Sequence, residues 1–299
     1  MCCKSGWFGL IPLEAMRQRR PVLFKGRHFE AEIILLCVRW YLRFALSYRD
    51  LKEMMAERNL SVDHVTIWRW VQRYAPELSQ RCRRELRRTN GSWRVDETYL
   101  RVAGKWTYLY RAVDSEGNSI DFFLSPNRDA IAAKQFFRKA LRTPGHPRPR
   151  VINVDGNPSY PKVIAELKVS RELGRRCRCR PVQYLNNIVE QDHRSIKRRV
   201  RASQGYRSFD GAWRTIQGIE TARMIRKGQV RWLPKGDVSG QVLFINLALW
   251  AEDRLTRSAS HAEKRASSLL FATLPLLVSA FAAPGLILAA IGLYAVISH

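Results

Sequence analysis

The sequence has few acidic residues for its size. It contains 26 Asp and Glu against 52 Lys and Arg, which gives a formal net charge of +26. A hydrophobic content of 46% excludes a disordered basic tail and predicts a packed core. A folded chain this positive favours a polyanionic partner, with nucleic acid first and an anionic membrane surface second.

Cysteine is also scarce. Of the six cysteines, only Cys177 and Cys179 are closely paired, and no second Cys or His pair follows at zinc-finger spacing. This excludes a zinc finger, fits a reducing cytoplasm and leaves the segment around the pair as a basic loop. The N-terminus lacks an uninterrupted signal core because Gly9 and Pro12 break it, so residues 1–24 are expected to be an extension.

Charge is absent from the C-terminal end, where residues 266–299 contain no Asp, Glu, Lys or Arg. This stretch exceeds the roughly 20 residues that span a bilayer, although Pro275, Pro284 and Gly285 interrupt it. It loosely resembles a segment of ABC-transporter permeases. We therefore expect residues 241–299 to form an apolar tail, either fused to the chain or able to associate with a membrane.

The first ordered region is helical. Apolar residues recur at helical spacing in residues 30–46, and Ser47 begins a second helix with a capping-box pattern. Asp63 is the expected cap of a third helix, which is predicted to end before Pro76. Three helices with a tight break before the last predict an all-α helix-turn-helix domain over residues 25–80.

The third helix carries different residues on its two faces. One face has side chains suited to the DNA major groove, namely Thr66, Arg69, Gln72 and Arg73. The other has the apolar residues expected to pack inward, namely Val65, Trp68 and Val71. A small helical bundle with a solvated basic face is the alternative, and the net charge favours DNA binding.

From Ser92 the pattern changes to strands. β-branched and aromatic runs separated by turn residues predict an antiparallel three-stranded meander over residues 92–102, 105–113 and 119–125. A further strand is expected to end at Asp155. Helices are predicted over residues 128–141, 159–168, 183–200 and 209–229. Residues 90–230 thus form one mixed α/β unit.

Three acids stand out by position. Asp96 lies in the first strand, Asp155 ends a later strand and Glu190 lies on a basic helix. Acids in apolar strands are costly unless they are paired or bound to metal. Carboxylates suit Mg²⁺ or Mn²⁺, and two such ions support phosphoryl transfer. The neighbouring bases that would hold a DNA backbone are Arg194, Lys197 and Arg198.

Other residues near these acids have simpler expected roles. Three acids are predicted to be structural, namely Glu97, Asp114 and Asp192. His193 is expected to be exposed or to contact DNA rather than to shuttle protons. Three strand aromatics are expected to pack in the core rather than stack on bases, namely Trp106, Tyr108 and Tyr110.

Three stretches carry a resemblance: "VDHVTIWRWVQRYAPE", "WRVDETYLRVAGKWTYLYRAVDSEG" and "YLNNIVEQDHRSIKRR". From about Phe24 to about Gly240 the chain resembles DDE transposases of the bacterial insertion-sequence six family. The resemblance implies an RNase H-like core with Asp96, Asp155 and Glu190 as metal ligands. It also implies release of a 3′-hydroxyl at the element end, attack of that hydroxyl on target DNA and replicative cointegrate formation.

The expected partners follow from that resemblance. They are double-stranded DNA at the element ends and in the target, and further copies of the chain assembled on DNA in the cytoplasm. The alternative function is a catalytically crippled helix-turn-helix remnant that binds DNA without cutting it. A membrane-anchored DNA-binding protein is the third hypothesis, because of the apolar tail.

Overall fold

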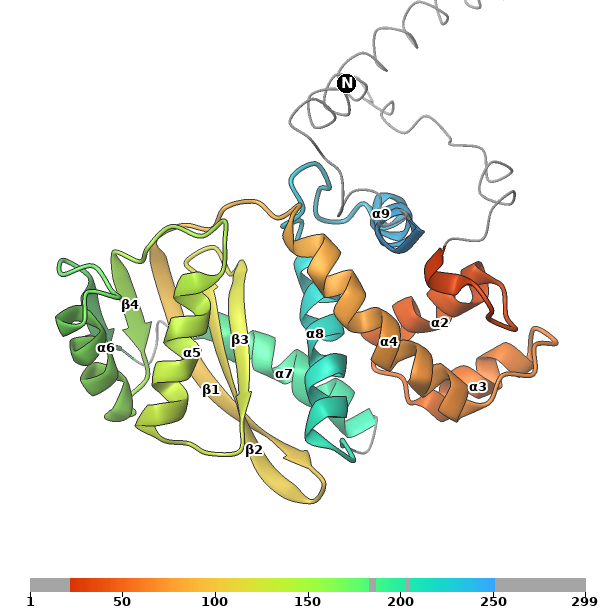
Figure 1. The fold of residues 1–299 in the computed structure, drawn as a ribbon, viewed down its shortest axis with the longest axis horizontal. Helices are drawn as coiled ribbons and strands as arrows, with labels where there is room; N and C mark the ends of the chain where they lie inside the picture. The colour runs from red at the N-terminus through yellow and green to blue at the C-terminus, as the bar shows by residue number, and fades with distance from the viewer. Residues whose placement is uncertain (1–21, 183–186, 203–204, 251–299) are drawn as a thin grey trace, which may run out of the picture. The chain divides into compact units, whose positions relative to one another are not determined.

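The computed structural model describes residues 22–182, 187–202 and 205–250 (Figure 1). A short 3₁₀ helix, η1 (Val22–Phe24), precedes the helices α2 (Ala31–Arg43), α3 (Tyr48–Ala56) and α4 (His64–Arg83). The strands are β1 (Ser92–Val102), β2 (Lys105–Asp114), β3 (Ser119–Ser125), β4 (Val151–Val154) and β5 (Arg178–Pro181). The remaining helices are α5 (Ala130–Arg142), α6 (Ser159–Val169), α7 (Asn187–Ala202), α8 (Phe209–Arg226) and α9 (Val238–Trp250).

The strands form one five-stranded sheet in the order β3-β2-β1-β4-β5. β1, β2 and β3 pair antiparallel, which confirms the predicted meander, and β4 and β5 are added parallel to β1. A meander extended by parallel strands, with helices on both faces, is the RNase H-like arrangement expected from the sequence. β4 pairs with β1 only over Ser92–Val95, so the rest of β1 extends beyond the parallel part of the sheet.

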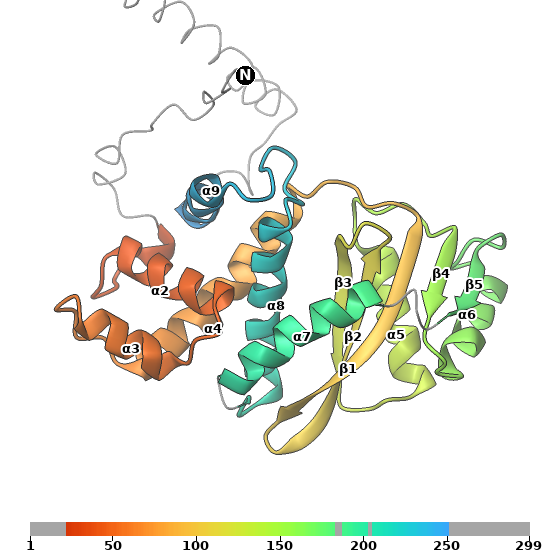
Figure 2. The ribbon, with the colours of Figure 1, turned by 180° about the vertical axis from the view of Figure 1, so that it is seen from behind.

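Each face of the sheet has its own hydrophobic core. Trp93, Val95 and Tyr110 pack against α5 and α6 on one face. Leu100, Leu109 and other residues of the opposite face belong to a core shared with α7 and α8. Figures 1 and 2 show these two helical layers from opposite sides.

The N-terminal helices are not packed separately from the α/β unit of residues 90–230. α4 contacts α2, α3, α8 and α9, and one core joins these helices to the sheet. Arg111 of β2 and Glu220 of α8 form a buried ion pair of 2.9 Å across the contact between sheet and helix. The predicted boundary between residues 80 and 90 is therefore a change in secondary structure and not a gap between two cores.

Two predicted elements differ in the structure. α4 continues through Pro76 to Arg83 rather than ending before the proline. The extra turns bury Leu78 and Cys82, and this packing offsets the cost of the proline. Where a basic loop was expected near Cys177, the structure has β5. The sequence pattern does not predict this strand, because β5 pairs with β4 through main-chain hydrogen bonds and has no β-branched residues.

The tail prediction is wrong at its start. Residues 241–250 belong to α9, where Phe244, Ile245 and Leu249 are buried. The uncharged stretch, residues 266–299, lies outside the described residues. Among the helices that the structure describes, none is long and apolar enough to cross a membrane.

Candidate active site

Two predicted ligands meet where β1 and β4 separate. Val95 and Val154 are the last paired residues of the two parallel strands, and Asp96 and Asp155 directly follow them. Neighbouring strands lie about 4.8 Å apart. Sheet geometry therefore brings two acids together that are far apart in the sequence.

Glu97 completes a close group with these two aspartates. One carboxylate oxygen from each of Asp96, Glu97 and Asp155 lies within 4.8 Å of the other two. However, Glu97 Oε1 accepts hydrogen bonds from Arg128 Nε at 2.7 Å and Asn157 Nδ2 at 3.0 Å, and Oε2 accepts one from the Tyr160 hydroxyl. Glu97 is thus held by three protein donors, while one of its oxygens belongs to the group that could hold a metal ion.

The electrostatics of the group favour a bound cation. Burial raises the pKa of Asp96 to about 7, and the charges of Asp155, Glu97 and Glu190 add to this shift. Burial, followed by the charge of Glu97, also raises the pKa of Asp155. The carboxylates repel one another at this position, and a divalent cation would relieve that repulsion.

α7 brings Glu190 and His193 to the same region. Glu190 is exposed in the first turn of α7, and its charge acts on Asp96, although it is not part of the close group of oxygens. His193 is buried, with Nδ1 3.6 Å from Asp96 Oδ2. The expectation of an exposed His193 is wrong, because Val189, His193 and Ile196 form the buried face of the helix.

The residues present fit a divalent metal ion. Asp96, Asp155 and Glu190 offer oxygen ligands, which Mg²⁺ and Mn²⁺ prefer. The side chain of Asp96 is only 14% exposed, so the group is partly shielded from water. Arg128, 2.6 Å from Glu97, balances one of the negative charges of the group.

The exposed face of α7 is basic. Arg194, Lys197 and Arg198 are all exposed, as helical spacing predicted, whereas their neighbour Arg199 is buried. Arg199 donates to Ser195 Oγ at 3.0 Å and to the main-chain oxygen of Arg43. The side chain of Asp192 lies outside the described residues. Three cations therefore remain accessible beside Glu190.

The exposed face of α4 differs from the prediction. Arg69 and Arg73 are exposed and Thr66 is half-buried, but Gln72 is buried and donates to Thr215 Oγ1 at 2.9 Å. Trp68 is 42% and Val65 38% exposed, although both were expected to pack inward. Gln72 is thus largely covered by α8, although it still borders the hollow described below, and Trp68 and Val65 are part of the exposed face.

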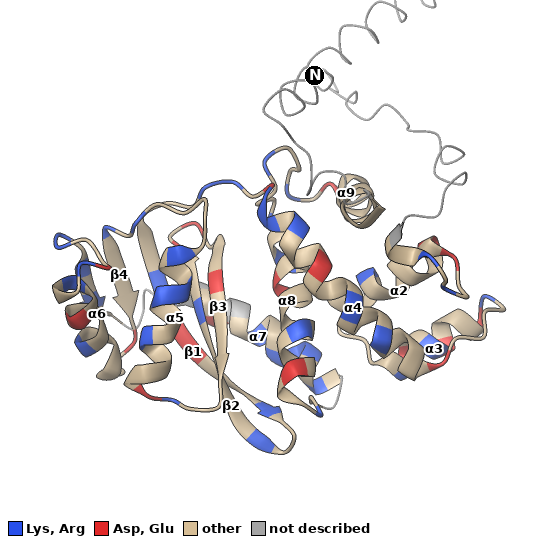
Figure 3. Ribbon diagram, in the orientation of Figure 1, with Lys and Arg blue, Asp and Glu red and all other residues tan. Residues whose placement is uncertain are grey.

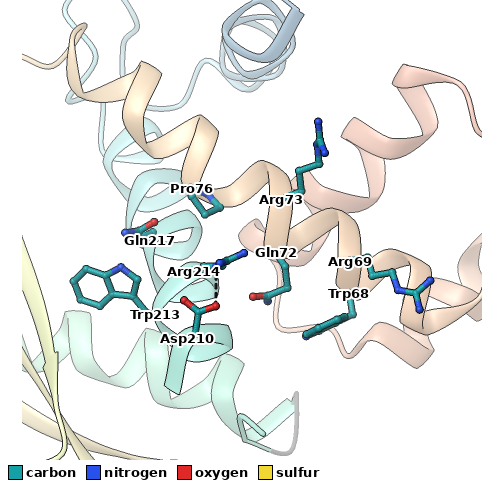
Figure 4. A pocket seen from close by; sticks show the side chains of 9 residues that line it. All are labelled: Trp68, Arg69, Gln72, Arg73, Pro76, Asp210, Trp213, Arg214 and Gln217. Atoms are coloured by element: carbon teal, nitrogen blue, oxygen red, sulfur yellow. Dashed lines mark ion pairs between the residues drawn. The ribbon is translucent and has the colours of Figure 1, made fainter. Parts of the chain in front are cut away.

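An open hollow lies between α4 and α8 (Figure 4). Arg69 and Arg73 line it from α4, and Trp213 lines it from α8. Arg214 and Asp210, which also line it, form an ion pair of 3.0 Å within α8. The basic residues of α4 therefore border a concave surface.

The sequence did not reveal three features near the site. These are the donors to Glu97, the contact of His193 with Asp96 and the exposure of Trp106. Trp106 is 50% exposed, whereas Tyr110 is buried as expected. The sequence "NPSYP" does not indicate that Tyr160 donates to Glu97, because this contact depends on how α6 packs on the sheet.

Asp114 has the structural role predicted for it. It accepts hydrogen bonds from the backbone N–H groups of Asn90, Glu116 and Asn118.

Acids placed where two adjacent parallel strands stop pairing, on an RNase H-like sheet beside exposed bases, define a class of metal-dependent enzymes that process DNA strands. A family model described as a DDE domain matches residues 90–229, which include all three predicted ligands. The chain is 39% identical over 210 residues to the "Transposase for insertion sequence-like element IS431mec" of Staphylococcus aureus (strain Mu50 / ATCC 700699). This match covers 70% of the present chain and 91% of that protein.

A second relative, the "Transposase for insertion sequence element IS257 in transposon Tn4003" of Staphylococcus aureus, matches with the same identity and coverage. Among solved structures, the HTLV-2 integrase catalytic core domain in complex with magnesium matches with a TM-score of 0.35 and 16% identity. That match covers 44% of this chain and 84% of the other. From its sequence relatives, the chain belongs to the insertion-sequence six family of transposases, and it is a DDE-type DNA transposase.

Proposed function

We propose that this transposase binds the terminal inverted repeats of its insertion sequence, cleaves a strand at each end and transfers it to target DNA. Asp96, Asp155 and Glu190 would hold two Mg²⁺ or Mn²⁺ ions. When bound, such ions polarise the scissile phosphate and lower the pKa of the attacking water or 3′-hydroxyl. The observation that carries the proposal is the meeting of Asp96 and Asp155 at the last paired residues of β1 and β4.

The surrounding residues position the acids and the DNA. His193 beside Asp96 limits the orientation of that carboxylate, and Arg128, Asn157 and Tyr160 fix Glu97. Exposed Arg194, Lys197 and Arg198 hold the strand through its phosphates. Thr66, Arg69 and Arg73 of α4 would contact the repeat, with residues 25–80 as the DNA-binding domain and 90–230 as the catalytic domain. Assembly of several copies on DNA and cointegrate formation are part of this proposal.

The test separates chemistry from binding. Asp96→Asn, Asp155→Asn and Glu190→Gln are each expected to abolish strand cleavage and transfer with Mg²⁺ but to retain binding of a terminal-repeat duplex. Glu166→Gln, an exposed acid of α6 whose side chain is 56% exposed, is the matched control and should keep activity. Full activity in a variant would remove that residue from the ligand set. A wild-type protein that binds ends and never cuts them would favour the crippled remnant.

The third ligand requires its own measurement, because Glu97 lies in the close group of oxygens and Glu190 does not. We expect Glu190→Gln to weaken Mn²⁺ binding, measured by electron paramagnetic resonance, without changing thermal stability. Glu97→Gln should lower the melting temperature, because Glu97 accepts hydrogen bonds from three side chains. The reverse pattern would assign the metal to Glu97.

A further inference from the structure

Aromatic and cationic side chains gather on the hairpin formed by β1 and β2. Tyr99 and Trp106 are 53% and 50% exposed, and their ring centroids lie 5.0 Å apart with the planes at 90°. The guanidinium carbon of Arg101 lies 4.8 Å from the Trp106 ring centroid, and Lys197 Nζ lies 4.4 Å from that of Tyr99. These four residues, Tyr99, Arg101, Trp106 and Lys197, are called the hairpin platform below.

The strand pairing explains why these rings remain uncovered. Trp106, Tyr108 and Tyr110 alternate along β2 and point to the face covered by α5 and α6. Tyr110 is buried there, Tyr108 is half-buried and Trp106 is exposed, because the hairpin extends past these helices. Tyr99 pairs with Tyr108 in register, and so it lies on the same uncovered part. No residue in the described part of the chain buries the two rings, which leaves a large apolar area in water.

Two elements lead from the acids to the platform. Tyr99 lies three residues beyond Asp96 on β1, about 10 Å along the strand, and its side chain leaves the opposite face of that strand. Lys197 lies seven residues beyond Glu190 on α7, a rise of about 10 Å along a helix. This separation corresponds to about three nucleotide steps of a DNA strand.

We propose that the hairpin platform stacks an unpaired base of the DNA strand close to the site of cleavage. This inference rests on the proposed function, because it assigns a contact to the same DNA substrate. Aromatic rings combined with cations are the usual means of holding unpaired nucleotides, since the rings stack on bases and the cations contact phosphates. The duplex would then be opened locally beside the carboxylates, which makes the scissile phosphate accessible.

Charge favours DNA over a second copy of the chain as the partner of this surface. Arg101 and Lys197 belong to the platform, and Lys105 on the hairpin is also exposed. The segment from Tyr99 to Trp106 contains no acid, and Figure 3 shows basic residues at the end of the hairpin. A second chain of net charge +26 would be repelled, whereas a polyanion carrying aromatic bases matches both the charge and the rings.

The test uses the full chain without divalent metal, so that binding is measured and no strand is cut. Two element-end duplexes of one sequence are compared, one fully paired and one with three unpaired nucleotides at the cleavage position. 2-Aminopurine at the unpaired positions reports stacking through quenching of its fluorescence. We expect Trp106→Ala and Tyr99→Ala each to weaken binding of the unpaired end about ten-fold and to abolish the quenching. Binding of the paired end should change less than about two-fold.

Matched variants distinguish stacking from loss of structure. Trp232→Ala removes a tryptophan that, like Trp106, is 50% exposed and in edge contact with another ring, here that of Phe244. This variant should bind both DNAs as the wild type does. Trp106→Phe and Tyr99→Phe keep a ring and should retain most of the preference for the unpaired end. Rescue by phenylalanine would not follow if the two positions only supported the fold.

Four results would overturn one or both proposals. If Trp106→Ala weakened binding of the paired and the unpaired DNA equally, the platform would contact only the sugar-phosphate backbone and would not stack on a base. A change in oligomeric state on gel filtration, without any change in quenching, would assign the rings to an interface between copies. A wild-type protein that binds element ends without quenching would overturn the platform alone, whereas one that binds no element end would overturn the proposed function as well.

Discussion

α4 and α7 both present arginines to solvent, but the surroundings of those arginines differ. On α7 the exposed residues near Arg194 are charged, namely Glu190, Lys197 and Arg198. On α4, exposed Arg69 and Arg73 lie beside Trp68 and Val65. A wholly charged face suits phosphates, which carry no sequence information, whereas a face that mixes arginine with apolar groups can contact base edges and thymine methyl groups. The comparison supports the proposal that α7 positions the strand and α4 discriminates the repeat.

The exposed face of α4 depends on what covers its other sides. α4 contacts α2, α3, α8 and α9, which together bury Ile67, Val71, Tyr74 and Leu78. Arg81 Nη1 also donates to the main-chain oxygen of Ala248 in α9 at 2.8 Å. α7, in contrast, rests on the sheet and buries only a narrow face. Substitutions in the helices that surround α4 should therefore disturb the exposed face of α4 more than that of α7.

The largest expected effect comes from removing α9. A chain ending after Gly240 loses buried Phe244, Ile245 and Leu249, a loss of about 5 kcal/mol or more of folding free energy. This is comparable with the whole stability of a typical domain, so the truncated chain is expected to unfold or aggregate. A chain ending after Trp250 keeps α9 and should remain folded. Circular dichroism melts of the two chains make the comparison, and equal melting temperatures would show that α9 does not support α4.

A smaller loss is expected from breaking the buried ion pair between α8 and the sheet. Arg111 and Glu220 are 1% and 2% exposed, so Glu220→Gln leaves a guanidinium buried beside a neutral partner. The expected cost is about 3–5 kcal/mol. Urea unfolding measures it, with exposed Glu166→Gln as the control. A change below about 1 kcal/mol would mean that the neighbouring groups already compensate the charge of Arg111.

Arg69 and Gln72 test which side chains of α4 reach the repeat. Arg69→Ala should reduce discrimination between repeat and random duplex by about 1–3 kcal/mol while stability is unchanged. Gln72→Ala should instead lower stability by about 1 kcal/mol, because its hydrogen bond to Thr215 is lost, and should leave discrimination intact. Competition binding assays and thermal melts measure the two quantities. Loss of discrimination in Gln72→Ala without destabilisation would restore the face predicted from the sequence.

These two helices also show how far the sequence could predict the site. α7 has few apolar residues, and those that are buried or pack on the core, among them Val189, Ile196 and Val200, indicate which side is buried and hence which bases are exposed. α4 has apolar residues around most of its circumference, among them Val65, Ile67 and Trp68. The neighbouring helices cover only some of these apolar residues. The periodicity of the sequence does not show which of them remain exposed. Gln72 was misplaced for this reason.

The strands gave a more reliable prediction than the helices because alternation and turn residues agree. β1 and β3 have the predicted bounds, and β4 ends at Val154, one residue before its predicted end at Asp155. The order of the strands could not come from alternation, because pairing of β1 with β4 depends on long-range contacts. Alternation alone placed Asp96 and Asp155 on strands but could not show that the two strands are neighbours. The resemblance to a known family indicated that the two acids meet.

The smallest expected effect concerns two adjacent arginines of α7. Arg198 is exposed, and Arg198→Ala should weaken binding to repeat and random duplex alike. The slope of log affinity against log salt concentration should fall by about 0.9, the value for one phosphate contact. Arg199 is 8% exposed and donates to Ser195 Oγ, so Arg199→Ala should lower the melting temperature and leave that slope unchanged. Fluorescence anisotropy over a series of salt concentrations measures both variants. A flatter slope in Arg199→Ala, or selective loss of repeat binding in Arg198→Ala, would contradict the division between α7 and α4, because α7 would then do more than contact phosphates.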